Sequence, residues 1–385
     1  MAPSLASVVN SVWEQPLPLP SLEGERLTDI LRLIRTPGIG PVMFFQLLRR
    51  YGSMADAIAA LPELSARGGR KTPLVAAAPE DIEKEIVLAQ KFGARFIRYG
   101  ETEYPPLLHM IPDPPPVLTI MGNTQLWQRQ SVGVVGARNA SANGCAFAQK
   151  ISSELGQAGT TIVSGLARGI DTYAHKGALA TGTVAVIASG IDLIYPPENE
   201  KLTKEIRERG AVVTEQPFGQ APFAAAFPGR NRIIAGISQG TLIVEAAPKS
   251  GSLITARLAN EQGRDVFAVP GHPLDPRAQG CNRLIKSGAQ LVEEAADILH
   301  ALALPRTQDM RELPLFDYTP ETLAEPAPEL QERVLAQLSP TPVSIDYLRA
   351  QCQVTPGALF AALMELELAG RILRVPGGTV CLNSF

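Results

Sequence analysis

The sequence has little cysteine, few aromatic residues and no excess of charge of either sign. Neither a disulfide framework nor a zinc site is expected from its four widely spaced cysteines, which form no CxxC pair: Cys145, Cys281, Cys352 and Cys381. Lysine and arginine number 35 against 38 acidic residues, giving a net charge of −3. That balance excludes a general attraction to nucleic acid, so any basic surface must be local.

Long apolar runs are also lacking. No uninterrupted apolar span is long enough to cross a bilayer, and the first residues show no basic flank followed by an apolar segment. We therefore expect no membrane segment and a cytoplasmic protein, in agreement with the unpaired cysteines.

The standard nucleotide-hydrolysis motifs are missing. GxxxxGK[ST] occurs nowhere, and the loop after Gly136 has neither the second and third glycines of GxGxxG nor an acidic ribose ligand at the expected distance. The chain therefore lacks the usual machinery for cleaving nucleoside triphosphates or binding a dinucleotide, and we expect neither cofactor nor metal.

Apolar strand-like runs instead alternate with amphipathic helical segments through the middle of the chain. Apolar strands with little internal alternation predict a parallel sheet covered on both faces, here a doubly wound, Rossmann-like α/β sheet of about six strands. The predicted strands are residues 131–136, 160–165, 183–190, 211–215, 240–246 and 265–271.

The length of 385 residues exceeds the usual size of one domain. Composition and pattern divide the chain into a Pro- and Ser-rich lead-in, a helical domain, the α/β domain, a Pro-, Glu- and Thr-rich linker and a C-terminal domain. Their expected bounds are 1–25, 26–91, 92–302, 303–328 and 329–385.

The N-terminal helical domain contains two amphipathic helices joined by Thr36-Pro37-Gly38-Ile39-Gly40. A glycine–apolar–glycine turn is typical of a helix-hairpin-helix, whose exposed amides hold a phosphate. A plain helical bundle with a glycine turn explains the same pattern and is the commoner case.

The C-terminal segment reads as three helices followed by a short hairpin, an order that resembles a winged helix. Its third helix would enter the DNA groove in a DNA reader, yet residues 355–370 contain no Lys or Arg and include Glu365 and Glu367. Phosphates would be repelled by that helix, which favours a protein contact or weak DNA binding.

Four loops follow predicted strands and combine glycine with arginine or hydroxyl residues. Ligands of α/β sheets bind at the carboxyl ends of the strands, and glycine amides with a guanidinium suit phosphate oxygens. Several such loops at one edge indicate a polyanion. Their candidate contacts are Gly136, Arg138 and Ser141; Ser164, Gly165 and Arg168; Arg230, Asn231 and Arg232; and Lys249, Ser250, Gly251 and Ser252.

The polar residues of these loops could also serve structural roles within the protein instead of binding a ligand. We expect Asp171 to cap the helix after the second loop, and His175 to be a packing or hydrogen-bonding residue. Arg230 and Arg232 are placed near a helix start, where their charge is unfavourable without an anion, and either Glu215 or Glu245 could supply it instead of DNA. Ser250 and Ser252 could be simple helix caps.

Aromatic residues around the third loop are candidate stacking platforms for bases: Phe218, Phe223 and Phe227. At least one of them is expected to pack in the core instead. With only 5% aromatic residues in the chain, backbone contact with little sequence specificity is expected.

The chain resembles the DNA-processing protein A (DprA/Smf) family. The resemblance is carried, in order, by VVGARNAS, SGLARGIDTYAHKGAL, GIDLIYPPEN, FPGRNRIIAG, VEAAPKSGSLITA and VPG…GCNRLIKSGA. It implies a non-enzymatic protein that binds and protects single-stranded DNA, dimerises through its Rossmann-like domain and loads the RecA recombinase during natural transformation. It also implies a DNA pocket lined by the arginine loops. One departure is Ala137, where many relatives have serine.

The rival hypothesis is a nucleotide-processing hydrolase related to the phosphoribohydrolases, which carry PGGxGTxxE after a strand. This chain keeps Gly240, Thr241 and Glu245 but lacks the Pro-Gly-Gly, and its glutamate is spaced differently from the threonine. The catalytic arrangement is therefore broken in the sequence.

Overall fold

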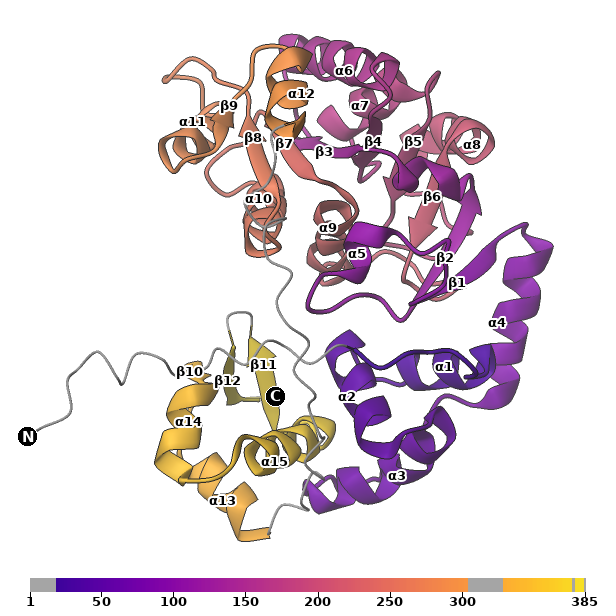
Figure 1. The fold of residues 1–385 in the computed structure, drawn as a ribbon, viewed down its shortest axis with the longest axis vertical. Helices are drawn as coiled ribbons and strands as arrows, with labels where there is room; N and C mark the ends of the chain where they lie inside the picture. Colours follow the sequence, from indigo (N-terminus) through magenta and orange to yellow (C-terminus); the bar gives the residue numbers. More distant parts are fainter. Residues whose placement is uncertain (1–18, 304–327, 376–377, 384–385) are drawn as a thin grey trace, which may run out of the picture.

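The computed structural model describes residues 19–303, 328–375 and 378–383 as three domains (Figure 1). Most of the predicted lead-in and linker lies outside the described residues. No helix among the described residues is long and apolar enough to cross a membrane.

The N-terminal domain is a bundle of four helices. Its first pair forms the glycine-turn hairpin predicted from the sequence, because Gly38 takes a positive φ of 89° and Pro41 opens the second helix at its first position. The helices are α1 (Leu27–Ile34), α2 (Pro41–Tyr51), α3 (Met54–Arg67) and α4 (Pro79–Lys91).

The central domain is built on a nine-stranded sheet with the order β1-β2-β6-β5-β4-β3-β7-β8-β9. Strands β3 to β9 are parallel, and the β1–β2 hairpin continues the sheet in the antiparallel sense beside β6. The strands are β1 (Arg95–Arg98), β2 (Val117–Gly122), β3 (Ser131–Gly136), β4 (Thr161–Ser164), β5 (Thr183–Val186), β6 (Ala211–Thr214), β7 (Gly240–Val244), β8 (Asp265–Ala268) and β9 (Gln290–Leu291).

The predicted doubly wound sheet is confirmed, and all six predicted strands form. The estimate of six was too low, because β1 and β2 extend the sheet beyond β6 and β9 forms the opposite edge. An edge strand pairs on one side only. β9 is exposed and β1 is only partly buried, so both lack the continuous apolar run of the central strands.

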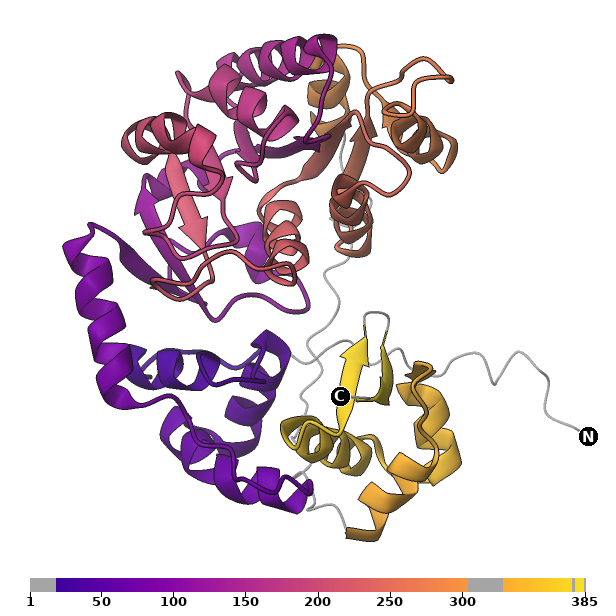
Figure 2. The ribbon, with the colours of Figure 1, turned by 180° about the vertical axis from the view of Figure 1, so that it is seen from behind.

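Helices cover both faces of the sheet (Figures 1 and 2). Val132 and Val134 of β3 pack with α6, α7 and α12 on one face, whereas Val135 belongs to the core on the opposite face with α9 and α10. The helices are α5 (Pro106–His109), α6 (Ala142–Gln157), α7 (Ile170–Ala178), α8 (Glu200–Arg209), α9 (Ala226–Ile237), α10 (Gly251–Glu261), α11 (Gln279–Lys286) and α12 (Ala295–Ala303), with the short 3-10 helices η2 (Thr124–Gln128) and η3 (Pro197–Asn199).

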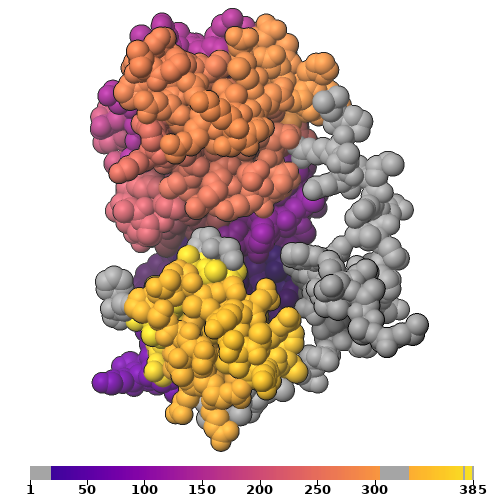
Figure 3. Space-filling view, turned by 90° about the vertical axis from the view of Figure 1, so that its left-hand side faces the viewer, coloured from indigo at the N-terminus to yellow at the C-terminus, as the bar shows by residue number. Residues whose placement is uncertain are grey.

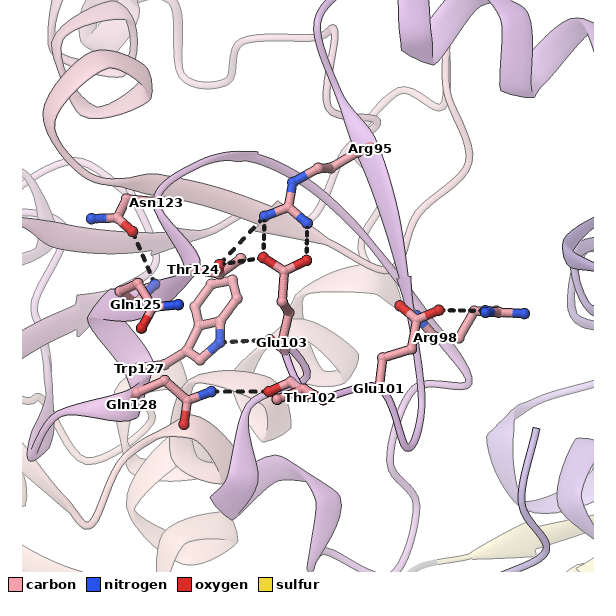
Figure 4. Close-up of polar contacts among 10 residues, drawn as sticks. All are labelled: Arg95, Arg98, Glu101, Thr102, Glu103, Asn123, Thr124, Gln125, Trp127 and Gln128. Atoms are coloured by element: carbon pink, nitrogen blue, oxygen red, sulfur yellow. Dashed lines mark hydrogen bonds and ion pairs between the residues drawn. The ribbon is translucent and has the colours of Figure 1, made fainter. Parts of the chain in front are cut away.

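A polar cluster fastens the β1 edge to the rest of the sheet (Figure 4). Arg95 of β1 donates hydrogen bonds to both carboxylate oxygens of Glu103, and Thr124 of η2 donates to the same carboxylate at 2.8 Å. The indole N–H of Trp127 donates to the carbonyl of Glu103 at 2.9 Å. These bonds hold η2 against the loop between β1 and β2, at the end of the sheet away from the arginine loops.

The C-terminal domain has the predicted winged-helix order of three helices and a hairpin. A third short strand completes its antiparallel sheet, with the order β10-β12-β11. The domain lies beside the helical domain (Figures 1 and 3). Its elements are α13 (Pro328–Ala336), β10 (Val343–Ser344), α14 (Ile345–Cys352), α15 (Pro356–Leu368), β11 (Ile372–Val375) and β12 (Thr379–Leu382).

Candidate functional site

A pocket of about 370 Å³ opens at the carboxyl ends of the parallel strands. Ligands of doubly wound sheets bind at this edge, and the volume lies within the range of small-molecule and nucleotide sites. Its wall comes from four successive strand-to-helix connections and the start of α9: Arg138 and Asn139; Gly165, Ala167 and Arg168; Ile187, Ala188, Ser189, Tyr195 and Pro196; Pro222; and, from α9, Phe227 and Arg230.

Three of the predicted arginines converge on this pocket. Arg138 is exposed and lies over the ring of Phe227, with its guanidinium carbon 5.0 Å from the ring centre. Arg168 is also exposed and pairs with Glu198 at 2.5 Å. Arg230 also lines the pocket but is buried. The two outer guanidiniums are therefore accessible to an anion, while the inner one is held in place.

Arg230 is fixed by a buried ion pair with Asp171. Its Nη1 lies 3.8 Å from Oδ2 of Asp171, and that oxygen also accepts hydrogen bonds from the amides of Gly165 and Ala167. Burial lowers the pKa of Arg230 and raises that of Asp171, and the attraction between the two opposes both shifts. Desolvation thus disfavours both charges, and each requires the other.

Asp171 does not cap α7 as the sequence suggested. The helix begins at Ile170, and the carboxylate reaches back to the preceding loop amides while facing Arg230. Gly165 makes this geometry possible, because a Cβ there would overlap the guanidinium of Arg230. Gly169, with a φ of 73°, brings the loop against the carbonyls of Ala137 and Arg138.

The segment FPGRNR was predicted as a loop leading into a helix, but the structure makes it part of α9, which starts at Ala226. Pro228 is tolerated there because it lies in the first turn, where an N–H has no helical partner. The helical conformation separates Arg230 from Arg232: the first lines the pocket, whereas the second pairs with Glu215 and Asp113.

Arg232 is a buried structural cation outside the pocket. It pairs with Glu215 and with Asp113, the latter at 3.4 Å. The main-chain carbonyl of Glu215 accepts a hydrogen bond from Arg35 of the helical domain at 2.8 Å, and Arg35 pairs with Glu85 at 2.9 Å. Of the two partners predicted for the arginines, Glu215 is thus confirmed for Arg232. Glu245 bonds elsewhere.

Glu245 occupies the point where the strand order reverses, between β3 and β7. Its carboxylate accepts hydrogen bonds from the amide of Ser141, at 2.8 Å, and from the Ser141 hydroxyl, at the N-terminus of α6. Dinucleotide-binding sheets hold a phosphate at this place. Here the chain's own carboxylate fills it, on a residue held at a φ of 55° that side chains rarely adopt.

Most of the remaining predicted site residues form internal contacts at the same sheet edge. Gly136 packs against the main chain of Val244, and the Ser164 hydroxyl donates to the Val134 carbonyl at 2.6 Å. Ser250 caps α10 and bonds to Ser252, while Lys249 and Gly251 are exposed beside them. Asn231 approaches the Gly251 carbonyl at 3.5 Å, so the third and fourth loops are neighbours.

The three phenylalanines have different environments. Phe227 lines the pocket, Phe223 is 45% exposed outside it, and Phe218 packs edge-on against Phe92. One of the three is thus a packing residue, as expected. Tyr195 also lines the pocket, with its ring centre 6.3 Å from that of Phe227. The aromatic residue in GIDLIYPPEN was the available signal for it.

His175 is fully buried and hydrogen-bonds through Nδ1 to Thr183 at 2.9 Å, which confirms the structural role expected for it. Burial, with a smaller contribution from Arg230, lowers the pKa of His175 to about 3.

Acidification should therefore destabilise the protein through His175. His175 takes up a proton near pH 6.5 in the unfolded chain but only near pH 3 in the folded protein. The free energy of unfolding therefore decreases as the pH is lowered from 6.5 toward 3. At pH 5 we expect a loss of about 2 kcal/mol relative to neutral pH. Urea unfolding of the wild type and His175→Asn across this range should give diverging curves; parallel curves would contradict the assignment.

Comparison with known proteins was consistent along the chain. Family models match three consecutive parts: the DprA-like N-terminal HHH domain over residues 23–87, DNA recombination-mediator protein A over 95–303, and the DprA winged helix domain over 319–378. The first match resolves the alternative between a helix-hairpin-helix and a plain bundle in favour of the former.

Curated relatives match over most of their length. Protein Smf of Synechocystis sp. is 35% identical over 88% of this chain and 94% of its own. Protein Smf of Escherichia coli is 40% identical, with coverages of 79% and 82%.

Two solved structures are similar. DNA processing protein A from Streptococcus pneumoniae has a TM-score of 0.61 and 34% identity, covering 72% of this chain and 98% of that one. The Helicobacter pylori protein, described for its unique single-stranded DNA binding mode, has a TM-score of 0.50 and 29% identity, covering 54% and 95%.

Proposed function

This chain belongs to the DNA-processing protein A (DprA/Smf) family, and from this premise we propose that it binds single-stranded DNA without sequence preference at the pocket described above. The finer role that we propose is protection of incoming DNA and loading of the RecA recombinase during natural transformation, by a cytoplasmic homodimer that is not an enzyme. The Helicobacter pylori relative, with its single-stranded DNA binding mode, supports the choice of ligand.

The observation that carries the proposal is the grouping of accessible arginine and aromatic side chains around one pocket. Arg138 and Arg168 are exposed at its rim, and Phe227 and Tyr195 lie in its wall. Proteins that bind single strands without sequence preference combine positive charge for phosphates with aromatic rings for bases. Both elements are present, although the whole chain has a net charge of −3.

We divide the predicted contacts into three groups. Arg138, Gly165, Arg168 and Arg230 form the pocket and are proposed to hold a nucleotide of the strand. Lys249 and Gly251, exposed at the start of α10, are proposed to meet phosphates outside it, with Ser250 and Ser252 holding the helix start in position. Gly136, Ser141, Ser164, Asn231 and Arg232 are proposed to support the loops from within.

The contacts of Glu245 argue against the rival hydrolase. A hydrolytic carboxylate must face its substrate, but that of Glu245 accepts two hydrogen bonds from Ser141 at the helix terminus. An incoming phosphate would have to displace a like-charged group from this place.

Fluorescence anisotropy with labelled poly-dT tests the proposal, at two salt concentrations and beside a duplex of equal length. We expect binding that prefers the single strand and weakens with salt, because each phosphate contact releases counterions. Absence of binding at low salt would refute it.

Removal of the Phe227 ring should weaken binding by about 10-fold, because loss of a stacking platform costs about 1–3 kcal/mol. The salt dependence should stay unchanged, since no phosphate contact is lost. Phe223→Ala is the matched control, as its ring lies outside the pocket lining. Equal effects of the two variants in the anisotropy assay would argue against stacking on Phe227.

A further inference from the structure

The third helix of the winged-helix domain is docked on the helical domain. Met364 and Leu368 of α15 belong to the same buried apolar core as α1, α2 and α3. The guanidinium of Arg70 donates to the Leu368 carbonyl at 3.2 Å, and the backbone at Gly68 comes so close that a Cβ would overlap the carbonyl oxygen of Glu365. The face that a winged helix presents to DNA is therefore covered.

Charge at this contact is unequally distributed. Glu365 is 1% exposed and faces two guanidiniums of the helical domain, Arg50 at 3.8 Å and Arg67 at 3.7 Å. Both distances exceed those of direct hydrogen bonds. Glu365 is thus the partner that α15 offers to both arginines, and Arg67 also pairs with Glu63 of its own helix at 3.9 Å. Arg70 lies at the C-terminal end of α15, which carries no Lys or Arg of its own.

We propose that Arg50, Arg67 and Arg70 form a second phosphate-binding face, and that the winged-helix domain is an acidic cap that covers it through Glu365. The proposal rests on the proposed function in that the displacing polyanion is single-stranded DNA. Phosphate groups offer each guanidinium a bidentate partner, which the shared carboxylate does not. Strand phosphates therefore compete with Glu365, and binding releases the cap.

The cost of burying charge makes the docked state sensitive to one residue. The attraction within a buried ion pair only slightly exceeds the free-energy cost of desolvating its two charges, but loss of one partner leaves the other charge uncompensated. Glu365→Gln keeps the shape of the side chain and removes the negative charge that α15 presents to Arg50 and Arg67, so the variant should uncap.

The same helix offers a matched control. Glu367 pairs with Arg374 at 2.8 Å within the winged-helix domain itself. Glu367→Gln therefore removes an equal charge from α15 without touching the helical domain.

Hydrogen exchange measured by mass spectrometry on the full chain shows directly whether α15 is docked on the helical domain. In the wild type, poly-dT should raise the exchange of α15 and of the end of α3; in Glu365→Gln, exchange should be raised without DNA, and in Glu367→Gln it should match the wild type. Unchanged exchange of α15 in both the DNA-bound wild type and Glu365→Gln would overturn the cap.

The salt dependence of poly-dT binding shows whether the proposed face contacts phosphates. Uncapping should steepen the slope of log affinity against log salt by about one per added phosphate contact. Adding Arg50→Gln and Arg67→Gln to Glu365→Gln should return the slope to the wild-type value. If Glu365→Gln raised the hydrogen exchange of α15 but did not steepen the salt dependence of poly-dT binding, the contact would be structural only and the phosphate site would be wrong.

Failure of the pocket would give a different result. If Arg138→Glu bound poly-dT like the wild type, the proposed pocket would be wrong, whereas the exchange and slope differences between Glu365→Gln and Glu367→Gln would be unaffected.

Discussion

Replacement of Arg138 by glutamate should lower the affinity for single-stranded DNA by about 100-fold. Loss of a charge-assisted hydrogen bond costs about 1.5–3 kcal/mol, and the new carboxylate adds repulsion toward the phosphate. Arg138 is exposed at the rim and lies over Phe227, so the substitution changes the charge and one stacking surface at once. The slope of log affinity against log salt should fall by about one in the anisotropy assay.

Arg129→Glu is the matched control. It makes the same change in net charge on an exposed residue just before β3, at the amino ends of the strands and thus opposite the pocket. If the two reversals weakened binding equally, the effect would come from net charge alone, and the pocket would not be the binding site.

Replacement of Asp171 by asparagine should reduce the free energy of unfolding by about 3 kcal/mol, because removal of one partner from a buried ion pair leaves an uncompensated charge. Arg230 is buried and Asp171 is its partner at 3.8 Å. The new amide would also direct N–H groups or a weaker acceptor toward the amides of Gly165 and Ala167. Urea unfolding at neutral pH measures the loss.

Glu198→Gln tests an exposed ion pair for comparison with the buried one, because its partner Arg168 lines the same pocket. Glu198 pairs with Arg168, but both side chains are more than half exposed, so water replaces the lost interaction and little stability should change. A stability loss in Asp171→Asn no larger than that in Glu198→Gln would show that Arg230 finds another counterion or leaves its buried position.

The structure also links the pocket to the helical domain. Arg230 and Arg232 lie two residues apart on α9; the first lines the pocket, and the second bonds to Glu215, whose carbonyl is held by Arg35 of the helical domain. The first turns of α9 are thus positioned from both sides by buried charge.

Much of the fold and part of the site followed from the sequence. The apolar runs were enough to predict the positions of the central strands, because a strand buried on both faces requires apolar residues throughout. Arg138, Arg168 and Arg230 were placed in one pocket by a general property of parallel sheets, whose strand ends meet at one edge. The order of elements in the winged helix and the absence of basic residues from its third helix could also be recognised in the sequence.

Pairing between residues distant in the chain was decided only by the tertiary structure. Glu245 bonds to Ser141 at the N-terminus of α6, Asp171 rather than a glutamate compensates Arg230, and β1, β2 and β9 extend the sheet at its two ends. The third helix of the winged-helix domain contacts the helical domain of the same chain through Arg50 and Arg67, which no local pattern indicated. Local pattern records what a residue needs, such as burial or a counterion, whereas the partner that satisfies the need depends on which segments the packed core brings together.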